Sequence, residues 1–343
     1  YRSCIKSINI SSQVTRIGKS AFFECKQLHQ VEISNDSKLQ EIDDDSFKKT
    51  SIKRIKIPSQ VTRIGRGAFF DCKKLQEVEI PNDSKLQVIC INSFNDTLIK
   101  RITIPSQVVQ IGKYVFCNCK NLQLVEFSDD SKLQIIDECT FAGLSIKKIK
   151  IPSQVEQISS CAFLNCPDLQ QVEILNDSKL KTIGERAFCE TKIESITIPK
   201  YVSELAEGWC NSTSKLIKVN VSDENERYRC FENMIIGKKI NDQNNYDCLV
   251  FCARNIKIVK IPSFIEYISS YAFDKCKKIL KLEFENDSKI KIIGDCSFNK
   301  SSISSIKFPS SVEHIKQQCF YHCNQCMIYK MFSSITKTCM MNE

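Results

Sequence analysis

The chain has 343 residues, which is more than the roughly 250–300 residues that one compact hydrophobic core usually serves. Its formal net charge is +9, from 49 basic and 40 acidic residues, and the two signs are interleaved, which argues against nucleic-acid binding. No stretch approaches the about 20 apolar residues of a membrane-spanning helix. Because the sequence begins at Tyr1, it carries no information about a leader peptide.

An internal repeat organises the whole chain. The tripeptide Ile57-Pro58-Ser59 recurs at positions 104 and 151, each 47 residues after the last, and again at 261, with variants at 10, 198 and 308. Each 47-residue phrase has two halves, because successive apolar triplets end 24, 23 and 24 residues apart, at Ile33, Ile57, Ile80 and Ile104. The structural unit is therefore one coil of 23 to 24 residues, and such a fixed period indicates a stacked array.

One strand is predicted in each coil, where apolar and polar residues alternate. At Val31, Glu32 and Ile33 the alternation predicts two buried side chains around an exposed one. We expect fourteen such strands to stack in parallel. Their last apolar residues are Ile10, Ile33, Ile57, Ile80, Ile104, Phe127, Ile151, Ile174, Ile198, Val221, Ile261, Phe284, Phe308 and Met331.

The return side of each coil carries an aliphatic pair and then an aromatic residue. Val61 and Ile64 form one such pair and predict a short strand, whereas the following IGxxAF segment predicts a short helical or 3-10 turn. A shared glycine column, represented by Gly65 and Gly184, predicts a tight bend. We expect the rings to stack as a core spine of Phe22, Phe47, Phe69, Phe94, Phe116, Phe141, Phe163, Phe188, Trp209, Phe273, Phe298 and Phe320.

One coil breaks this register. The strands that end at Val221 and Ile261 are 40 residues apart, 16 more than the expected 24. Two apolar segments, 234–236 and 249–251, flank a polar, Asn-rich stretch and predict a β-hairpin that projects from the array. We therefore predict a single repeat domain over 1–343, with a hairpin insertion at 222–255 and a C-terminal tail or cap at 332–343.

The repeated phrase IPSQVTRIGRGAFFDCKKLQEVEI resembles the BspA-like class of leucine-rich repeat proteins, over essentially the whole chain. The resemblance implies a leucine-rich repeat solenoid, a curved, right-handed stack of about 14 coils. It implies one long parallel β-sheet on the concave face, with short helical or 3-10 turns, or short strands, on the return side. It also implies surface display and adhesion to host or matrix proteins, whereas the residues themselves indicate only an extended scaffold.

Twenty cysteines occur in the chain. Neighbours in the AFxxC column are two coils apart, about 10 Å, which is beyond the reach of a disulfide. We expect them to be small buried apolar residues with free thiols, and free thiols favour a reducing or anaerobic setting. The members of this column are Cys25, Cys72, Cys119, Cys166, Cys276 and Cys323.

A second group of cysteines has the spacing of zinc ligands: Cys319, His322, Cys323 and Cys326. The repeat columns already account for Cys323 and Cys326, so we predict no metal site and no cofactor. No nucleophile motif and no phosphate-binding glycine loop occurs either. A metal-dependent enzyme that uses this C-terminal cluster is the third of three functional hypotheses.

The exposed strand positions carry the most informative pattern, because acidic residues alternate with Lys or Thr from strand to strand. Side by side in a parallel sheet, such pairs contribute about 0.2–1 kcal/mol each, so one interpretation is a self-neutralising polar surface. The other interpretation is a recognition surface for a protein or glycan, and the two are compatible. The residues of this predicted concave binding face are Glu32, Lys56, Glu79, Thr103, Glu126, Lys150, Glu173 and Thr197.

The leading hypothesis is a non-enzymatic interaction or adhesion module that binds a macromolecular partner through this face, as a surface antigen would. The second hypothesis is an intracellular leucine-rich repeat scaffold, which the unpaired thiols favour. The expected partner is a protein or glycan and not a nucleic acid, and the expected location is the cell surface or the exterior, with the cytoplasm as the alternative. The sequence predicts no oligomeric state.

Overall fold

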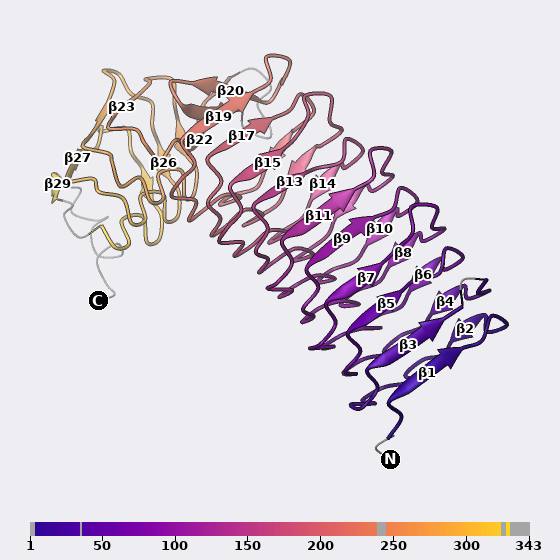
Figure 1. Ribbon diagram of the computed structural model, residues 1–343. Helices are drawn as coiled ribbons and strands as arrows, with labels where there is room; N and C mark the ends of the chain where they lie inside the picture. The colour runs from indigo at the N-terminus through magenta and orange to yellow at the C-terminus, as the bar shows by residue number, and fades with distance from the viewer. Residues whose placement is uncertain (1–3, 35, 239–244, 324–326, 330–343) are drawn as a thin grey trace.

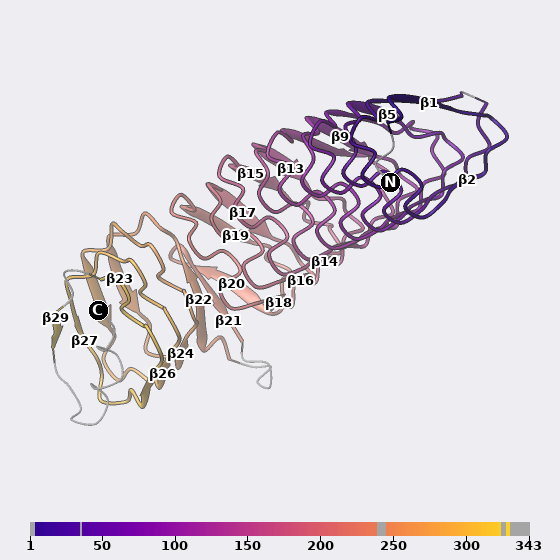
Figure 2. The same cartoon turned by 90° about the horizontal axis from the view of Figure 1, so that it is seen from below.

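The computed structural model describes residues 4–34, 36–238, 245–323 and 327–329, and all of its regular elements are β-strands. Figure 1 shows the coils stacked one on another into a curved array. Because these residues form no helix, none of them makes a helix that could span a bilayer. One series of strands runs along each of two sides of the array, as the view from below shows (Figure 2).

The first series, which we call the ladder, contains the fourteen predicted strands. They are β1 (Ser7–Ile10), β3 (Gln30–Ile33), β5 (Arg54–Lys56), β7 (Glu77–Glu79), β9 (Arg101–Ile104), β11 (Leu124–Phe127), β13 (Lys148–Lys150), β15 (Gln171–Glu173), β17 (Ser195–Ile198), β19 (Lys218–Val221), β23 (Ile258–Ile261), β25 (Lys281–Phe284), β27 (Ser305–Lys307) and β29 (Met327–Tyr329). The last strand pairs Lys307 with Tyr329, so Tyr329 takes the position predicted for Lys330. Lys330 and Met331 lie outside the described residues, as does the predicted cap at 332–343.

Hydrogen bonding divides the ladder into short parallel sheets, such as β1–β3, β5–β7 and β9–β11, instead of the one long sheet that was predicted. The paired residues within these blocks are 22 to 24 residues apart, and most are 23 apart, as at Lys56 and Glu79. We call the solvent side of these strands the ladder face. In Figure 1 it is turned toward the viewer from β1 to β19, and the array bends within the plane of the picture.

The second series confirms the predicted short strands of the return side, and it holds the continuous sheet. Nine two-residue strands pair in parallel: β2 (Arg16–Ile17), β4 (Glu41–Ile42), β6 (Arg63–Ile64), β8 (Val88–Ile89), β10 (Gln110–Ile111), β12 (Ile135–Ile136), β14 (Gln157–Ile158), β16 (Thr182–Ile183) and β18 (Glu204–Leu205). Beyond the insertion the pattern resumes with β24 (Tyr267–Ile268), β26 (Ile292–Ile293) and β28 (His314–Ile315).

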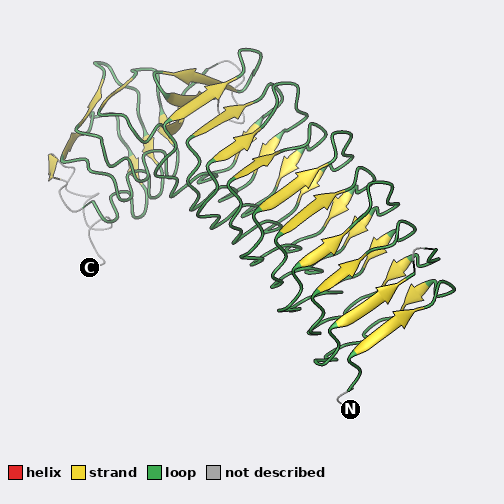
Figure 3. Cartoon of the chain, in the orientation of Figure 1, coloured by secondary structure: helices red, strands yellow, loops and turns green. Residues whose placement is uncertain are grey.

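The IGxxAF segment forms a chain of turns, so the predicted helical or 3-10 turn is wrong in the described residues (Figure 3). Ser20 and Glu24 have φ angles of 54° and 56°, and a left-handed residue interrupts any right-handed helical run. The N–H groups of Ser20, Phe22 and Glu24 donate to carbonyl oxygens of the next coil at 2.9, 2.7 and 2.9 Å. The intervening N–H groups close turns within the coil, so the backbone donors are satisfied without a helix.

The predicted aromatic spine forms, except that the ring of Trp209 meets that of Phe188 edge-on, with the planes at 86°. From Phe22 to Phe188 the successive rings stack with centroids 5.1–5.7 Å apart and planes within 15° of parallel. Phe273, Phe298 and Phe320 repeat the arrangement at 4.9 and 5.2 Å. Stacked rings are therefore packed by the coils next to them, which makes the core continuous from the first coil to the inserted residues.

The inserted residues do not project from the array as predicted. They form β20 (Tyr228–Phe231), β21 (Met234–Gly237) and β22 (Cys248–Cys252), which pair antiparallel, and β22 then pairs in parallel with β24. Ile235 and Phe251 are buried in the core on the N-terminal side, whereas Ile236 and Leu249 belong to the core on the other side. Both faces of the hairpin are apolar, so it is buried on both and forms a wall between two cores.

The glycine column is required by a close approach between coils. A Cβ atom on Gly184 would lie 2.6 Å from the backbone nitrogen of Ser160 in the preceding coil, and one on Gly65 would lie 2.5 Å from that of Asp44. At Gly18, in the same column, nothing lies within 4 Å.

We predict that Gly184→Ala lowers the free energy of unfolding by about 1–3 kcal/mol, because the methyl group must displace backbone. Gly18→Ala is the matched control and should leave stability unchanged or raise it slightly, because it only restricts the unfolded chain. Urea unfolding followed by circular dichroism measures both. Equal effects of the two substitutions would show that the close approach is not what selects glycine.

Candidate interaction surface

The structure places all eight predicted surface residues on the ladder face. The strand alternation buries their neighbours Val31, Ile55, Ile102 and Ile149 and turns the polar residues outward. The six charged residues are exposed, and the two threonines are half-buried. By strand they are Glu32 (β3), Lys56 (β5), Glu79 (β7), Thr103 (β9), Glu126 (β11), Lys150 (β13), Glu173 (β15) and Thr197 (β17).

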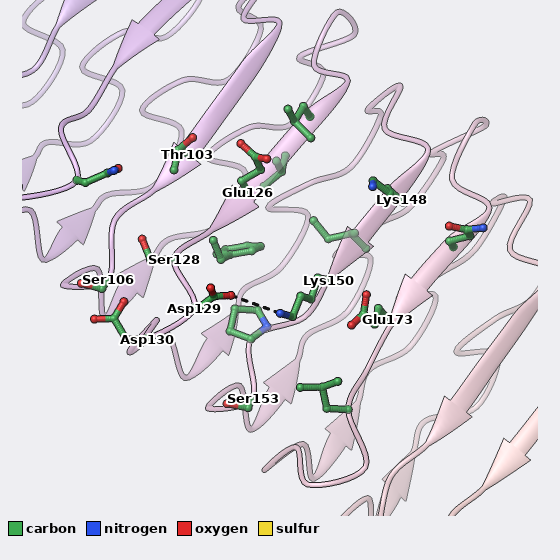
Figure 4. Close-up of a pocket in the computed structure, with 18 residues that line it drawn as sticks. Thr103, Ser106, Glu126, Ser128, Asp129, Asp130, Lys148, Lys150, Ser153 and Glu173 are labelled. Atoms are coloured by element: carbon green, nitrogen blue, oxygen red, sulfur yellow. Dashed lines mark hydrogen bonds and ion pairs between the residues drawn. The ribbon is translucent and has the colours of Figure 1, made fainter.

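The expected neutralisation of neighbouring charges is only partly realised. Lys56 Nζ lies 3.7 Å from Glu79 Oε1, as the register predicts, although both side chains remain about half exposed or more. Lys150 is the register neighbour of Glu173, but its Nζ lies 3.4 Å from Asp129 Oδ1 in the turn after β11 (Figure 4). Exposed pairs of this kind contribute at most about 1 kcal/mol each, so they do not explain why the charges are there.

A hollow of about 750 Å³ lies on the ladder face across β9, β11, β13 and β15 (Figure 4). Its apolar lining includes Val125, Ile149 and Leu175, and Ser106 and Ser153 lie at the turns that border it. Four carboxylates and two lysines surround this lining, a local charge of −2 on a chain whose total is +9: Glu126, Asp129, Asp130, Glu173, Lys148 and Lys150. Asp129 and Asp130 were missed by sequence reasoning, because they lie in turns outside the strand columns.

Some carboxylates on the return side form shorter ion pairs than those of the ladder face. Glu41 and Asp43 lie between Arg16 and Arg63, with the shortest distance 2.6 Å from Arg16 Nη2 to Asp43 Oδ2. The backbone N–H of Asp44 lowers the pKa of Asp43, and Arg16 adds to this effect against the opposing effect of burial. These charges join successive coils to one another at short distances, whereas the hollow contributes the longer and more exposed pair between Lys150 and Asp129.

The cysteine column has a structural role that the sequence did not reveal. The thiols of Cys72, Cys119 and Cys166 donate to the carbonyl oxygen of a phenylalanine in the preceding coil at 3.0, 3.1 and 3.1 Å. Burial raises the pKa of Cys72 to about 11 and that of the other two to about 12. All 18 cysteines among the described residues are free thiols. The sequence does contain a sign of this role, because Thr50 and Thr97 each lie 22 residues before a cysteine of the column. Their hydroxyls lie 3.3 and 3.1 Å from the sulfur atoms of those cysteines.

The candidate zinc ligands behave as members of the repeat. Cys319 is buried beside the hydroxyl of Ser297, and the Cys323 thiol donates to the carbonyl oxygen of Phe298 at 2.8 Å. The His322 ring packs against Tyr321, and Cys326 lies outside the described residues. Across the described ranges, no group of three or more His, Cys, Asp or Glu side chains is arranged to hold a metal ion.

Comparison with known proteins identifies the class. The family model for the BspA type leucine rich repeat region, present in six copies, matches residues 1–123, 120–236 and 244–341. The chain therefore belongs to the BspA-type leucine-rich repeat family. A search of curated proteins found no match.

Solved structures show the same fold. A leucine-rich repeat protein from Bacteroides ovatus is 21% identical, with a TM-score of 0.59 over 96% of this chain and 82% of the other. A leucine rich cell surface protein from Faecalibacterium prausnitzii is 19% identical, with a TM-score of 0.58 over 95% and 82%. A leucine-rich repeat protein from Eubacterium ventriosum is also 19% identical, with a TM-score of 0.53 over 97% and 93%.

Because of the buried thiols, the free energy of unfolding should depend on pH in the alkaline range. A thiol whose pKa is raised by folding stabilises the protein fully below its unfolded pKa of about 9, and this contribution is lost as the pH rises toward the folded value. We therefore predict that stability falls between pH 9 and 11, by at most about 1.4 kcal/mol per pH unit for each such thiol. Urea unfolding of the protein and of Cys119→Ala at both pH values measures this, and the variant should lose less. Parallel losses in the two proteins would contradict the assignment.

Proposed function

We propose that the chain is a non-enzymatic interaction module that binds a macromolecular partner through the ladder face, centred on the acidic hollow. The observation that carries the proposal is the concentration of Glu126, Asp129, Asp130 and Glu173 around an apolar lining. The buried half of each strand supplies the packing, so these side chains are free to serve recognition.

The charge of the hollow favours a protein partner that presents basic side chains beside an apolar group. Four carboxylates attract Lys or Arg from solution, and Leu124, Phe127 and Leu175 offer partly exposed apolar area beside them. A glycan is the second candidate, because carboxylates and serine hydroxyls such as those of Ser106 and Ser153 accept hydrogen bonds from sugar hydroxyls.

Catalysis finds no support in the described residues. His29, His314 and His322 are all exposed, and the Nδ1 atom of His29 lies 3.0 Å from the carbonyl oxygen of Gln27. General acid–base or nucleophilic chemistry needs two or three such groups within hydrogen-bonding reach of one another. The described part of the chain presents no such constellation around a histidine.

Membership of the BspA-type family supports display at the cell surface, and a structural neighbour from Faecalibacterium prausnitzii carries the description of a cell surface protein. The second candidate is a scaffold inside the cell. The free thiols of the described residues favour it, because disulfides accumulate in oxidising compartments.

The proposal is tested by reversing the charge of the hollow. We expect Glu126→Lys with Glu173→Lys to weaken partner binding at least about tenfold, because two attractive contacts become repulsive. The measurement is binding to an array of purified matrix proteins and glycans. Glu185→Lys is the matched control, since Glu185 is exposed on the turns of the return side and lies outside the hollow.

Circular dichroism must show that all three proteins are folded, which the exposed positions lead us to expect. The proposal would be contradicted if the double variant kept full binding and Glu185→Lys abolished it. That result would place the recognition surface on the return side.

A further inference from the structure

The cysteine column follows one rule in most coils and breaks it in one. Cys72, Cys119, Cys166 and Cys323 each lie 25 residues after a ring of the aromatic spine and donate the thiol proton to its carbonyl oxygen, at 2.8–3.1 Å. A Thr or Ser three residues after the ring adds its hydroxyl in three of these coils. Each of these sulfur atoms is therefore a hydrogen-bond donor, which requires the neutral thiol.

Cys276 is the exception, because the hairpin has altered the coil before it. Cys252 takes the place of the aromatic ring there: its N–H donates to the Ala272 oxygen, as the N–H of Phe47 donates to Ala68. The Cys276 sulfur lies 4.0 Å from the Cys252 oxygen, about 1 Å farther than in the other coils. The donor contact that defines the column is therefore weakened at Cys276.

Arg254 occupies the position from which a hydroxyl approaches the sulfur in the other coils. Its Nη1 atom donates to the Cys276 sulfur at 3.5 Å and to the carbonyl oxygens of Ala272 and Cys252 at 2.9 and 3.2 Å. The side chain is only 3% exposed, and its Nε and Nη2 atoms have no hydrogen-bond partner among the described residues. A guanidinium buried in this way needs a nearby anion.

The carboxylate nearest to this cluster is already engaged. Asp274 accepts hydrogen bonds from the side-chain amide of Asn299 and from the backbone N–H of Ser212, at 2.6 and 2.5 Å. Asp274 and Cys210 interact with Arg254 electrostatically but without a hydrogen bond to it, and the ring of Phe251 lies 4.4 Å from the guanidinium carbon. The sulfur of Cys276 is thus the acidic atom that Arg254 touches directly.

We propose that Cys276 is a thiolate paired with Arg254 and that, with Cys252 as its partner, it forms a site of oxidation by hydrogen peroxide. Burial opposes ionisation of Cys276, but the neighbouring Cys252 thiol and the charge of Arg254 outweigh it and lower the pKa of Cys276. The same arrangement raises the pKa of Cys252, chiefly through burial. One thiol of the pair is therefore the nucleophile, and the other retains its proton.

The reaction balances with peroxide as the only co-reactant. The Cys276 thiolate attacks one peroxide oxygen, and the O–O bond breaks. Hydroxide is the leaving group, and Cys276 becomes a sulfenic acid. Cys252 then loses its proton and attacks the Cys276 sulfur, so that the S–O bond breaks and a disulfide forms. The two sulfur atoms lose two electrons in total, and one peroxide becomes one water and one hydroxide.

The site lies at the wall between the two cores, since Phe251 belongs to one core and Cys252 to the other. Oxidation removes the negative charge that Arg254 touches and leaves the buried guanidinium compensated only by the more distant carboxylate of Asp274. The consequence is a joint whose stability depends on the redox state, within an array whose other coils are unaffected.

The test compares cysteines within one molecule. The folded chain is treated with hydrogen peroxide at pH 7.5, quenched with an alkylating reagent, unfolded, digested and analysed by mass spectrometry. We expect Cys276 to be oxidised at least about tenfold faster than Cys119 and Cys166, which are equally buried, and we expect a peptide that links Cys252 to Cys276. Similar rates at the three cysteines would overturn the proposal, and this comparison needs no variant.

Three variants separate the roles of Cys252 and Arg254. Cys252→Ser should stop the reaction at a sulfenic acid on Cys276, which dimedone traps. Arg254→Met should slow oxidation of Cys276 at pH 7.5 to the rate of Cys119, and Arg254→Lys, which keeps the charge, should restore part of it. Unchanged oxidation of Cys276 in folded Arg254→Met would show that Arg254 does not hold the thiolate.

Discussion

Adjacent coils of this protein are joined by backbone hydrogen bonds that run in both directions. The N–H groups of the return turns donate to the coil that follows, whereas those of Lys38, Gln40 and Asp43 donate to the coil before. In the return segment the donors are alternate residues, as at Ser20, Phe22 and Glu24, and each finds a carbonyl oxygen of the next coil at 2.7–2.9 Å. Such bonds hold adjacent backbones about 5 Å apart. The aromatic rings then stack at 5.1–5.7 Å from Phe22 to Phe188, and the ladder strands fall into register on the opposite side.

This constraint explains which parts of the fold could be predicted. Apolar side chains that face the core must recur with the coil, so the strands and the spine were readable from the 23- and 24-residue steps. The left-handed turns were not readable, because the residues that adopt them share no chemistry. Asp45, Tyr114, Cys139 and Arg186 all take φ angles between 52° and 59° in the same column. There the bonds to the next coil outweigh the intrinsic preference of each residue.

The candidate surface was predicted in part, for a related reason. Strand alternation gives the direction of Glu126 and Glu173, but the hollow also depends on Asp129 and Asp130 in a turn. The turn places Asp129 beside Lys150, a contact between positions 21 residues apart that no column of the repeat contains. The position of the hairpin in the chain was likewise predicted from the sequence, but the hairpin was expected to project and is instead buried. Its apolar residues alone do not indicate whether one face or both are covered.

The hairpin wall also limits how far any disturbance can spread, because it separates the two cores. The ladder face to its N-terminal side is backed by one uninterrupted spine and so presents a rigid surface to a partner. The joint itself contains two thiols in place of a ring and a buried guanidinium whose Nε and Nη2 atoms have no hydrogen-bond partner among the described residues.

The central claim is that each coil is stabilised by its neighbours and not by a shared globular core. Hydrogen–deuterium exchange of Phe116→Ala, compared with the unaltered protein, tests it directly. Exchange should accelerate in the coils that contain Phe94, Phe116 and Phe141, with no change across residues 265–323 beyond the hairpin wall. Uniform acceleration along the whole chain would contradict the account.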